Sequence, residues 1–280
     1  MRKSILGGAA LIATSLAFSI ISWTPPTKIQ SELSNSVTAS GPAVSADSLY
    51  QRHIMGIYEA ANLKEAGLNA EVFTKALTGF YNLKDAGKLS KDRSILSIVD
   101  FDQKSTEKRL YIVDLDNQKL LVKTWVAHGN GSGNDVATNF SNISNSYQSS
   151  LGFYVTGEIY TGKHGKSLRL DGMDQGTNSN ARNRAIVVHG ADYVSQGTIN
   201  ALGRLGRCQG CPAVAQELAN TVINTINGKT VLFINKTVDS YSSKFLDSHN
   251  AALFAMQADM KQLDYAKVDT VAGLDSATSI

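Results

Sequence analysis

Two cysteines and one histidine are the residues of this chain best suited to covalent chemistry. Cys208 and Cys211 stand three positions apart, Gly210 directly precedes the second, and His189 lies earlier in the chain. An imidazole that takes the proton of a thiol leaves a thiolate, the form of cysteine that attacks carbonyl carbons. Gly210 would let the backbone approach such a carbonyl, and N–H groups near the cysteine could hold an oxyanion. The pattern predicts Cys211 as nucleophile and His189 as its general base.

A buried strand and a glycine-rich turn must position this pair. The apolar segment Ala185–Val188 is predicted as a strand that ends at His189, and Gly190 follows. The second segment, Gly206–Pro212, is predicted as a tight turn that carries the cysteines. A histidine at a strand end that faces a cysteine in a turn is typical of a thiolate–imidazole site.

The pattern of the surrounding chain predicts a mainly β domain. Alternating and short apolar runs indicate six further strands: Leu96–Phe101, Arg109–Leu115, Lys119–Ala127, Gly152–Thr156, Ser167–Leu170 and Thr230–Ile234. A long polar segment, His128–Ser150, is expected to be a functional loop or disordered. Ala215–Ile226 has the spacing of a helix. Strands without regular βαβ alternation favour a mainly antiparallel β-sandwich or open barrel.

The residues around both motifs resemble a known family. The pattern H-G … G-R-x-x-G-C-P-A, at His189–Gly190 and Gly206–Ala213, is similar to that of YkuD-type L,D-transpeptidases, in particular the divergent murein L,D-transpeptidase branch. The resemblance covers about half of the chain in separate blocks, namely Ser97–Leu115, Val126–Gly133, Phe140–Asn142 and Ser149–Tyr154. It implies a fold of the β-sandwich kind, with a few helices.

The resemblance also implies roles for single residues. Cys211 takes the place of the family's nucleophile, and the backbone carbonyl of Gly190 would orient His189. Arg207 would bind a carboxylate of the substrate, or else be an ordinary surface arginine. Cys208 departs from the branch, which has serine there. It would act as a polar neighbour of the substrate, or form a disulfide with Cys211 that blocks the nucleophile.

Other interpretations of these residues are weaker. A redox C-x-x-C pair expects a βαβ context, which the strand-rich pattern does not provide. A zinc site of the deaminase type needs glutamate two residues after the histidine, where this chain has Ala191. The resemblance implies no metal and no organic cofactor. His128 and His164 precede glycines in predicted loops. They would either line the cleft or, as is usual for polar loop histidines, be solvated, and neither is assigned to the site.

The ends of the chain predict export and accessory segments. Residues 1–23 begin with two basic residues and continue as an apolar run, which is typical of a signal peptide; the run is also near the length of a membrane anchor. A polar linker is expected over residues 24–46 and an α-helical hairpin over 47–90, with Asn69 as the second N-cap. The catalytic domain would span 91–236. A polar tail, 237–280, follows, with a helix expected over Lys244–Leu263.

The resemblance and the predicted export together suggest a function. The chain is expected to act in the periplasm or cell envelope, on peptidoglycan stem peptides, as an L,D-transpeptidase that cross-links them. With water as acceptor it would instead be an L,D-carboxypeptidase or endopeptidase. A Cys208–Cys211 disulfide would leave a silent wall-binding module. The formal net charge is only +3 and no basic stripe appears, so nucleic acid is not an expected partner.

Overall fold

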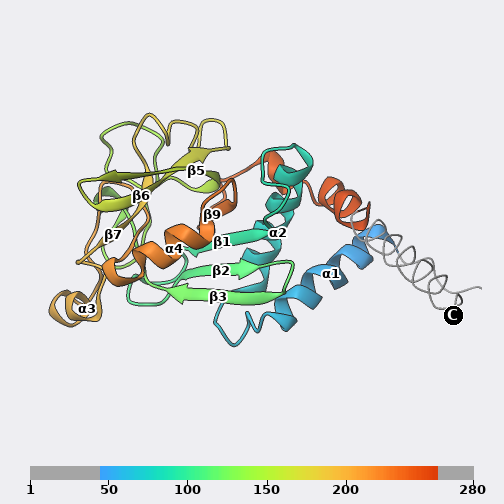
Figure 1. Ribbon diagram of the computed structural model, residues 1–280, viewed down its shortest axis with the longest axis horizontal. Coiled ribbons are helices and arrows are strands. Elements are labelled where there is room, and N and C mark those ends of the chain that lie inside the picture. The colour runs from blue at the N-terminus through green and yellow to red at the C-terminus, as the bar shows by residue number, and fades with distance from the viewer. Residues whose placement is uncertain (1–44, 258–280) are drawn as a thin grey trace, which may run out of the picture. The chain divides into compact units, whose positions relative to one another are not determined.

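A computed structural model describes residues 45–257 of the chain (Figure 1). Within these residues nine strands form one sheet in the order β3-β2-β1-β9-β5-β6-β7-β8-β4. The strands are β1 (Ile95–Asp100), β2 (Leu110–Asp114), β3 (Lys119–Thr124), β4 (Val126–Ala127), β5 (Gly152–Gly162), β6 (Gly165–Gly172), β7 (Val187–Ala191), β8 (Ala213–Ala215) and β9 (Val231–Asn235). The mainly β class expected from the sequence is confirmed.

The sheet is mixed and curls toward closure. Most neighbouring strands are antiparallel, but β1 with β9 and β7 with β8 are parallel. The first and last strands of the order, β3 and β4, are separated in the chain by Trp125 alone. One residue spans only a few ångströms, so the two edges of the sheet must lie close together. The result is a nearly closed, barrel-like sheet.

Four α-helices with defined bounds and three short 3₁₀ turns complete the described elements. They are α1 (Ala46–Ala60), α2 (Ala70–Asp85), α3 (Gln196–Leu202), α4 (Ala219–Ile226), η1 (Asn130–Ser132), η2 (Gln216–Leu218) and η3 (Lys244–Leu246). A further helix occupies 248–257 at the end of the described residues. The side chain of Asn69 accepts from the Glu71 N–H at 2.7 Å, which confirms the predicted N-cap of α2.

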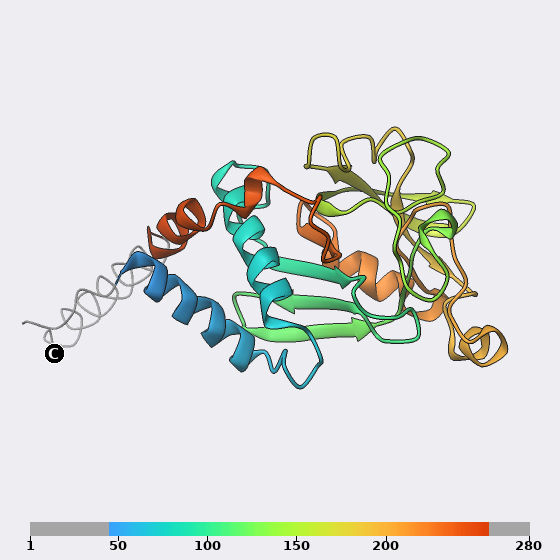
Figure 2. The ribbon, with the colours of Figure 1, turned by 180° about the vertical axis from the view of Figure 1, so that it is seen from behind.

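Successive residues of the central strands contribute side chains to two hydrophobic cores, one on each face of the sheet. In β9, Phe233 packs with the helical hairpin of α1 and α2, whereas Ile234 packs with α4. This alternation follows from the two-residue period of a strand. The hairpin fits closely, because a Cβ on Gly79 of α2 would come within 2.0 Å of the Phe153 ring. Figures 1 and 2 show α2 and α4 on opposite sides of the sheet.

The structure corrects several predicted boundaries. The strand predicted to end at His189 instead runs from Val187 to Ala191, so His189 lies inside β7. The strand predicted over 119–127 is split at Trp125, where the chain passes from one edge of the sheet to the other. The helix predicted over 215–226 begins as a 3₁₀ turn. The predicted signal peptide lies outside the described residues, as does most of the predicted linker.

Candidate active site

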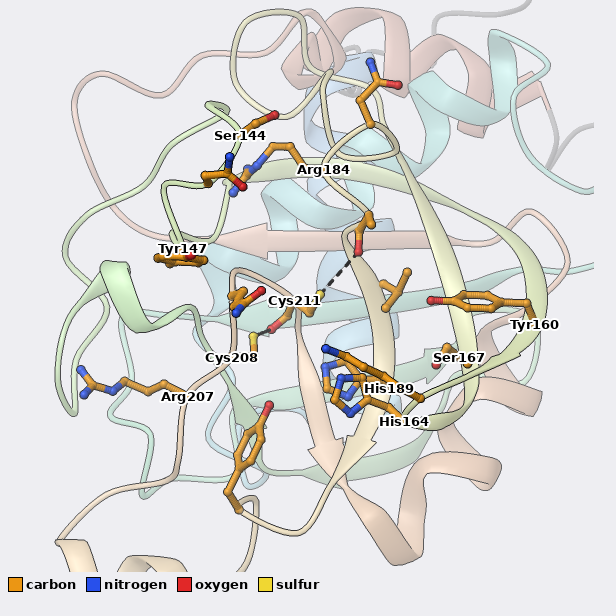
Figure 3. Close-up of a pocket in the computed structure, with 18 residues that line it drawn as sticks. Ser144, Tyr147, Tyr160, His164, Ser167, Arg184, His189, Arg207, Cys208 and Cys211 are labelled. Carbon is orange, nitrogen blue, oxygen red and sulfur yellow. Dashed lines mark hydrogen bonds between the residues drawn. The ribbon is translucent and has the colours of Figure 1, made fainter.

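A pocket of about 510 Å³ brings His189 and Cys211 together (Figure 3). Its walls come from four parts of the chain: the loop before β5, the β5–β6 hairpin, β7 with its flanking segments, and the turn before β8. All of these parts lie at one end of the curled sheet. The sequence analysis named the third and fourth parts and expected the loop before β5 to be functional or disordered, but it assigned no site residue to that loop or to the hairpin.

His189 is held by the strand and by its own neighbour. It is 2% exposed, and it pairs across the sheet with Ser167 of β6. The Nδ1 atom lies 2.8 Å from the carbonyl oxygen of Gly190, so Nδ1–H donates to this carbonyl. That tautomer leaves Nε2 without a proton, ready to accept one from a thiol. The contact expected between Gly190 and His189 is therefore present.

The turn that carries Cys211 depends on Gly210. Gly210 has φ +114°, a conformation that residues with a Cβ rarely adopt. A Cβ there would also lie 2.7 Å from the Gln148 carbonyl oxygen. After the turn, β8 pairs in parallel with β7, with Ala213 opposite His189. This register returns the chain to the histidine and sets Cys211 beside it.

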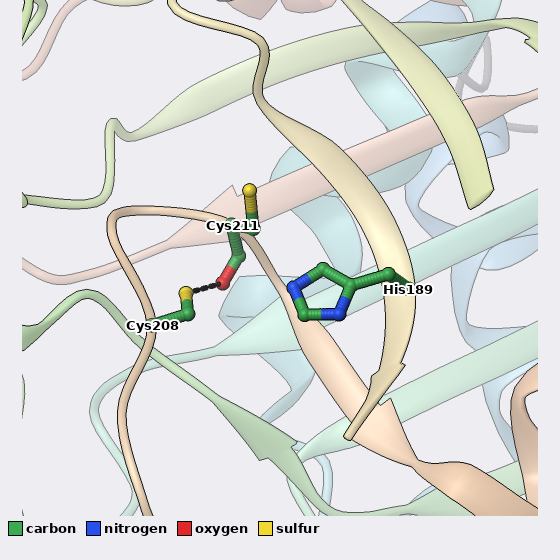
Figure 4. A group of neighbouring side chains, drawn as sticks. All are labelled: His189, Cys208 and Cys211. Carbon is green, nitrogen blue, oxygen red and sulfur yellow. Dashed lines mark hydrogen bonds between the residues drawn. The ribbon is translucent and has the colours of Figure 1, made fainter. Parts of the chain in front are cut away.

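The two thiols point to different partners (Figure 4). The Cys208 thiol donates to the Cys211 carbonyl oxygen at 2.6 Å, whereas the Cys211 thiol lies 3.7 Å from the Ala185 carbonyl oxygen. Both cysteines are free thiols in this structure. The main chain of Cys208 is fixed as well, since its N–H donates to the His128 carbonyl oxygen at 3.2 Å. These two hydrogen bonds of Cys208 stabilise the turn that carries Cys211.

The surroundings shift the pKa values of Cys208, Cys211 and His189 in different directions. The Cys208 side chain and then the facing imidazole hold the pKa of Cys211 well below its usual value, against the effect of burial. Burial alone would lower the pKa of His189, but the interactions with Cys211 and Gly190 outweigh it, and the pKa is raised. Burial, reinforced by Cys211, raises the pKa of Cys208. The arrangement favours a thiolate at Cys211 paired with an imidazolium at His189.

The remaining lining is cationic. Lys163, Arg184 and Arg207 line the pocket, and no aspartate or glutamate does. None of the three forms an ion pair with a carboxylate within residues 45–257. Arg207 donates through Nη1 to the Gly133 carbonyl oxygen at 2.6 Å. Such a lining suits a ligand that carries carboxylates.

Arg184 is a pocket residue that sequence reasoning missed. Its guanidinium donates only to neutral oxygens of the preceding loop: the carbonyls of Ser141 and Gln148, both at 2.6 Å, and the hydroxyls of Ser150 and Ser146, at 2.5 and 3.3 Å. These bonds hold the loop 128–150 as a wall of the pocket. An arginine directly before an apolar strand was the available signal, but its partners lie about forty positions away, beyond the reach of local patterns.

Of the two unassigned histidines, His128 is not solvated as expected, whereas His164 is exposed. His128 is 1% exposed, and its Nδ1 lies 2.8 Å from Nη2 of the fully buried Arg109. Burial, with the nearby Arg109 charge, lowers the pKa of His128 to about 4, so the ring is neutral. His164 is on the surface, yet its ring stacks on His189 in the pocket, with centroids 4.4 Å apart. A two-residue hairpin turn gives no sequence signal for such a contact.

One group in the described residues has the composition of a metal site. A ring nitrogen of His189 and the sulfur atoms of Cys208 and Cys211 lie within 4.8 Å of one another. Zinc in enzymes binds such ligands with a fourth position open. The residue two positions after the histidine is Ala191, however, so the acid that zinc deaminases require is missing.

A comparison of the sequence with models of protein families matches one family. The family model described as L,D-transpeptidase catalytic domain matches residues 64–235, more than half of the chain. None of the curated proteins matches the chain.

Solved structures with related folds share little sequence with this chain. An L,D-transpeptidase from Mycobacterium smegmatis is 10% identical over 51% of this chain and 59% of its own, with a TM-score of 0.32. The helical cell shape determining protein Pgp2 from Campylobacter jejuni is 17% identical over 64% of this chain and 63% of its own, with a TM-score of 0.35. An L,D-transpeptidase from Xylanimonas cellulosilytica is 14% identical over 70% and 94%, with a TM-score of 0.30.

The first two matches span less than two thirds of those proteins. At these TM-scores the structural likeness adds nothing to the assignment, which rests on the sequence match across the β sheet and the pocket. By that match, the chain belongs to the L,D-transpeptidase catalytic domain family.

Proposed function

We propose that this protein is a peptidoglycan-modifying cysteine acyl transferase that cross-links stem peptides. The observation that carries the proposal is the pairing of Cys211 with a His189 that its own Gly190 carbonyl orients. Membership of the family supports the reaction class. The paired charge states of the thiol and imidazole support the roles of nucleophile and general base.

In the first half of the reaction, the Cys211 thiolate attacks the carbonyl carbon at the L-centre of diaminopimelate in a tetrapeptide stem. A C–S bond forms and the C–N bond to the terminal D-alanine breaks. The His189 imidazolium gives its proton to the leaving amine. The products are a thioester on Cys211 and free D-alanine, so atoms and charge balance without a cofactor.

Backbone N–H groups would stabilise the oxyanion of the tetrahedral intermediate. The N–H groups of Gly210 and Cys211 interact with the Cys208 sulfur. These contacts act to lower the pKa of the Cys208 thiol, against the larger effect of burial. Within residues 45–257 neither donates to an oxygen atom. An oxyanion placed beside Cys208 would therefore find two donors in a largely buried site, where such bonds are strongest.

In the second half, an acceptor attacks the thioester. His189 takes the proton of the acceptor amine, a new C–N bond forms and the C–S bond breaks, which returns the thiolate. With water as acceptor the product is a shortened stem, the outcome of a carboxypeptidase or endopeptidase. The pocket opens to solvent at its exposed hairpin, so acceptor choice depends on which molecule the lining binds.

The cationic lining supports a substrate with free carboxylates. Arg207 and Lys163 are the residues we assign to this binding, and Cys208 the polar neighbour of the reacting carbonyl. Stem peptides carry carboxylates at their D-centres and at their ends. Arginine forks bind such groups with two parallel bonds.

Action on peptidoglycan requires export, and we assign residues 1–23 to a signal peptide or a membrane anchor. Within residues 45–257 no helix combines the length and apolar character needed to cross a bilayer. Immunoblots of cell fractions, with and without a substitution that places a charge in the apolar run, test export. An unchanged distribution of the altered protein would contradict the assignment.

Incubation of the protein with purified disaccharide-tetrapeptide tests the function, with products identified by mass spectrometry. The expected products are free D-alanine and a cross-linked dimer. A shortened monomer in place of the dimer would assign water as acceptor. Cys211→Ala is expected to give neither product, while Cys208→Ser retains turnover. Absence of all products, with binding to intact sacculi retained, would favour a wall-binding module instead.

A further inference from the structure

The ring of His164 stacks on the ring of His189, and the proposed chemistry gives it no role. The two centroids are 4.4 Å apart and the planes meet at 26°. Figure 3 shows both rings in the same wall of the pocket, with His189 on the side of Cys211. A contact of this kind between a general base and a second aromatic ring calls for an explanation.

The β5–β6 hairpin delivers His164 to this position. β5 ends at Gly162 and β6 begins at Gly165, so Lys163 and His164 form the tip. Gly165 has φ +73°, the left-handed conformation that a tight reversal needs. Three residues after His164, Ser167 pairs directly with His189. The register of β6 on β7 therefore holds the base of the hairpin beside His189, and the stacking contact shows that the tip turns back over it.

The His189 ring needs a second support. Among the described residues, the hydrogen bond from Nδ1 to the Gly190 carbonyl is its only one with a conventional geometry. One hydrogen bond places Nδ1, and the orientation of the ring plane depends on the groups that pack against its faces. The stacked His164 ring is one of these groups, and tilting of His189 would lose the face-to-face contact. Catalysis depends on such restraint, since a small misplacement of a base slows proton transfer strongly.

We propose that His164 is a positioning residue, which holds the plane of the His189 ring so that Nε2 faces the Cys211 thiol. This inference rests on the proposed function, because it assigns a support to the general base of that reaction. His164 touches neither the substrate carbonyl nor the thiol in this account.

The charge states fit this arrangement. Burial, and then the charges of His189 and Lys163, lower the pKa of His164, whereas the pKa of His189 is raised. These opposite shifts favour an imidazolium at His189 beside a neutral His164 ring, and a neutral aromatic face stabilises a cation. The other titratable groups that line the pocket around the pair are unchanged in sequence when His164 alone is substituted. They are Tyr160 and Lys163 on the hairpin, Tyr147 in the loop before β5, Arg184 before β7, Tyr193 after it, and Arg207, Cys208 and Cys211 before β8.

Two substitutions separate ring stacking from other roles. His164→Phe keeps an aromatic face without a titratable group, and His164→Ala removes the face. In the full chain, we expect His164→Ala to slow acylation by a carbapenem about five- to tenfold, and His164→Phe to restore most of the rate. Loss of the ring also withdraws support from the imidazolium, so the alkaline limb of the rate moves to lower pH in His164→Ala only.

Thr161→Ala on the same hairpin, outside the pocket, controls for damage to the turn, and thermal melting checks that each variant is folded. Wild-type rates and pH profile in a folded His164→Ala would overturn the inference, as would failure of His164→Phe to restore the rate. A wild type that is not acylated at all counts against the proposed function. In that case NMR titration of the His189 ring decides the inference: an unchanged pKa in His164→Ala overturns it.

Discussion

His189 and Ala213 are register partners in the parallel pair of β7 and β8, and Cys211 precedes Ala213 by two residues. His189 therefore lies inside β7, and Cys211 lies in the turn that leads directly into the neighbouring strand β8. Their separation depends on backbone hydrogen bonds, which are rigid, rather than on long side chains. Gly210 then reverses the chain so that the cysteine enters the pocket from the strand end.

Gly210 is expected to tolerate no side chain. Gly210→Ala places a Cβ 2.7 Å from the Gln148 carbonyl and forces φ +114° on an alanine. We expect a loss of about 2–4 kcal/mol in the free energy of unfolding, together with loss of acylation. Urea unfolding and intact mass measure the two effects. Gly176→Ala, with φ +78° and open space around the Cβ, is expected to lose only about 1 kcal/mol. Equal losses would contradict the close approach.

Cys208 is expected to tune the nucleophile. Its side chain is the largest influence that lowers the pKa of Cys211. Cys208→Ala removes this donor, so the pKa of Cys211 should rise and its alkylation by iodoacetamide should begin at higher pH. Cys208→Ser retains a donor, and its profile should stay close to that of the wild type. Peptide mass spectrometry follows modification at Cys211. Coincident profiles for the alanine variant and the wild type would argue that Cys208 only packs.

Arg184 is expected to stabilise the pocket wall far more than the neighbouring arginine does. Arg184→Gln removes four bonds to the loop 141–150, and we expect a loss of about 2–4 kcal/mol in unfolding free energy. Hydrogen exchange should increase across that loop. Arg182→Gln is the control, because Arg182 forms ion pairs with Glu158 and Asp171 on the exposed surface, where solvent screens them and little stability is lost on their removal. Unchanged exchange in the loop would refute the role.

His128 is expected to make folding sensitive to acid. Its folded pKa, about 4, lies below the unfolded value of about 6.5. The neutral ring is favoured in the fold, so its contribution is full above about pH 6.5 and is lost as pH falls toward 4, by up to about 3 kcal/mol. Urea unfolding at several pH values measures this. His128→Gln, which keeps an acceptor for Arg109, should flatten that part of the profile. An unchanged slope in this variant would assign the acid sensitivity to other groups.

Much of the fold was readable from periodicity, because alternating or continuous apolar runs mark strands such as β1, β2 and β9. The proximity of His189 and Cys211 could be predicted for a related reason, because short motifs record both the residue types and the glycines that let them approach. The family resemblance added the role of the Gly190 carbonyl, a backbone group that composition does not reveal.

The features that were missed depend on contacts between distant segments. Trp125 breaks a run of apparent strand because the sheet closes there, which is a property of the whole barrel. His128 was expected to be solvated in a loop, but it is buried, and its Nδ1 accepts a hydrogen bond from the buried Arg109. His164 depends on a hairpin that extends to Gly162, well beyond the predicted strand end at Thr156. Local patterns carry no record of such partners.

The most direct test of the central claim is the intact mass of the full chain after reaction with a carbapenem under reducing conditions. The account predicts one covalent adduct, present in the wild type and in Cys208→Ser and absent in Cys211→Ala. It also predicts that the adduct maps to Cys211 after digestion. No adduct on the reduced wild type, or an adduct that persists in Cys211→Ala, would contradict the assignment of Cys211 as the acyl-transfer nucleophile.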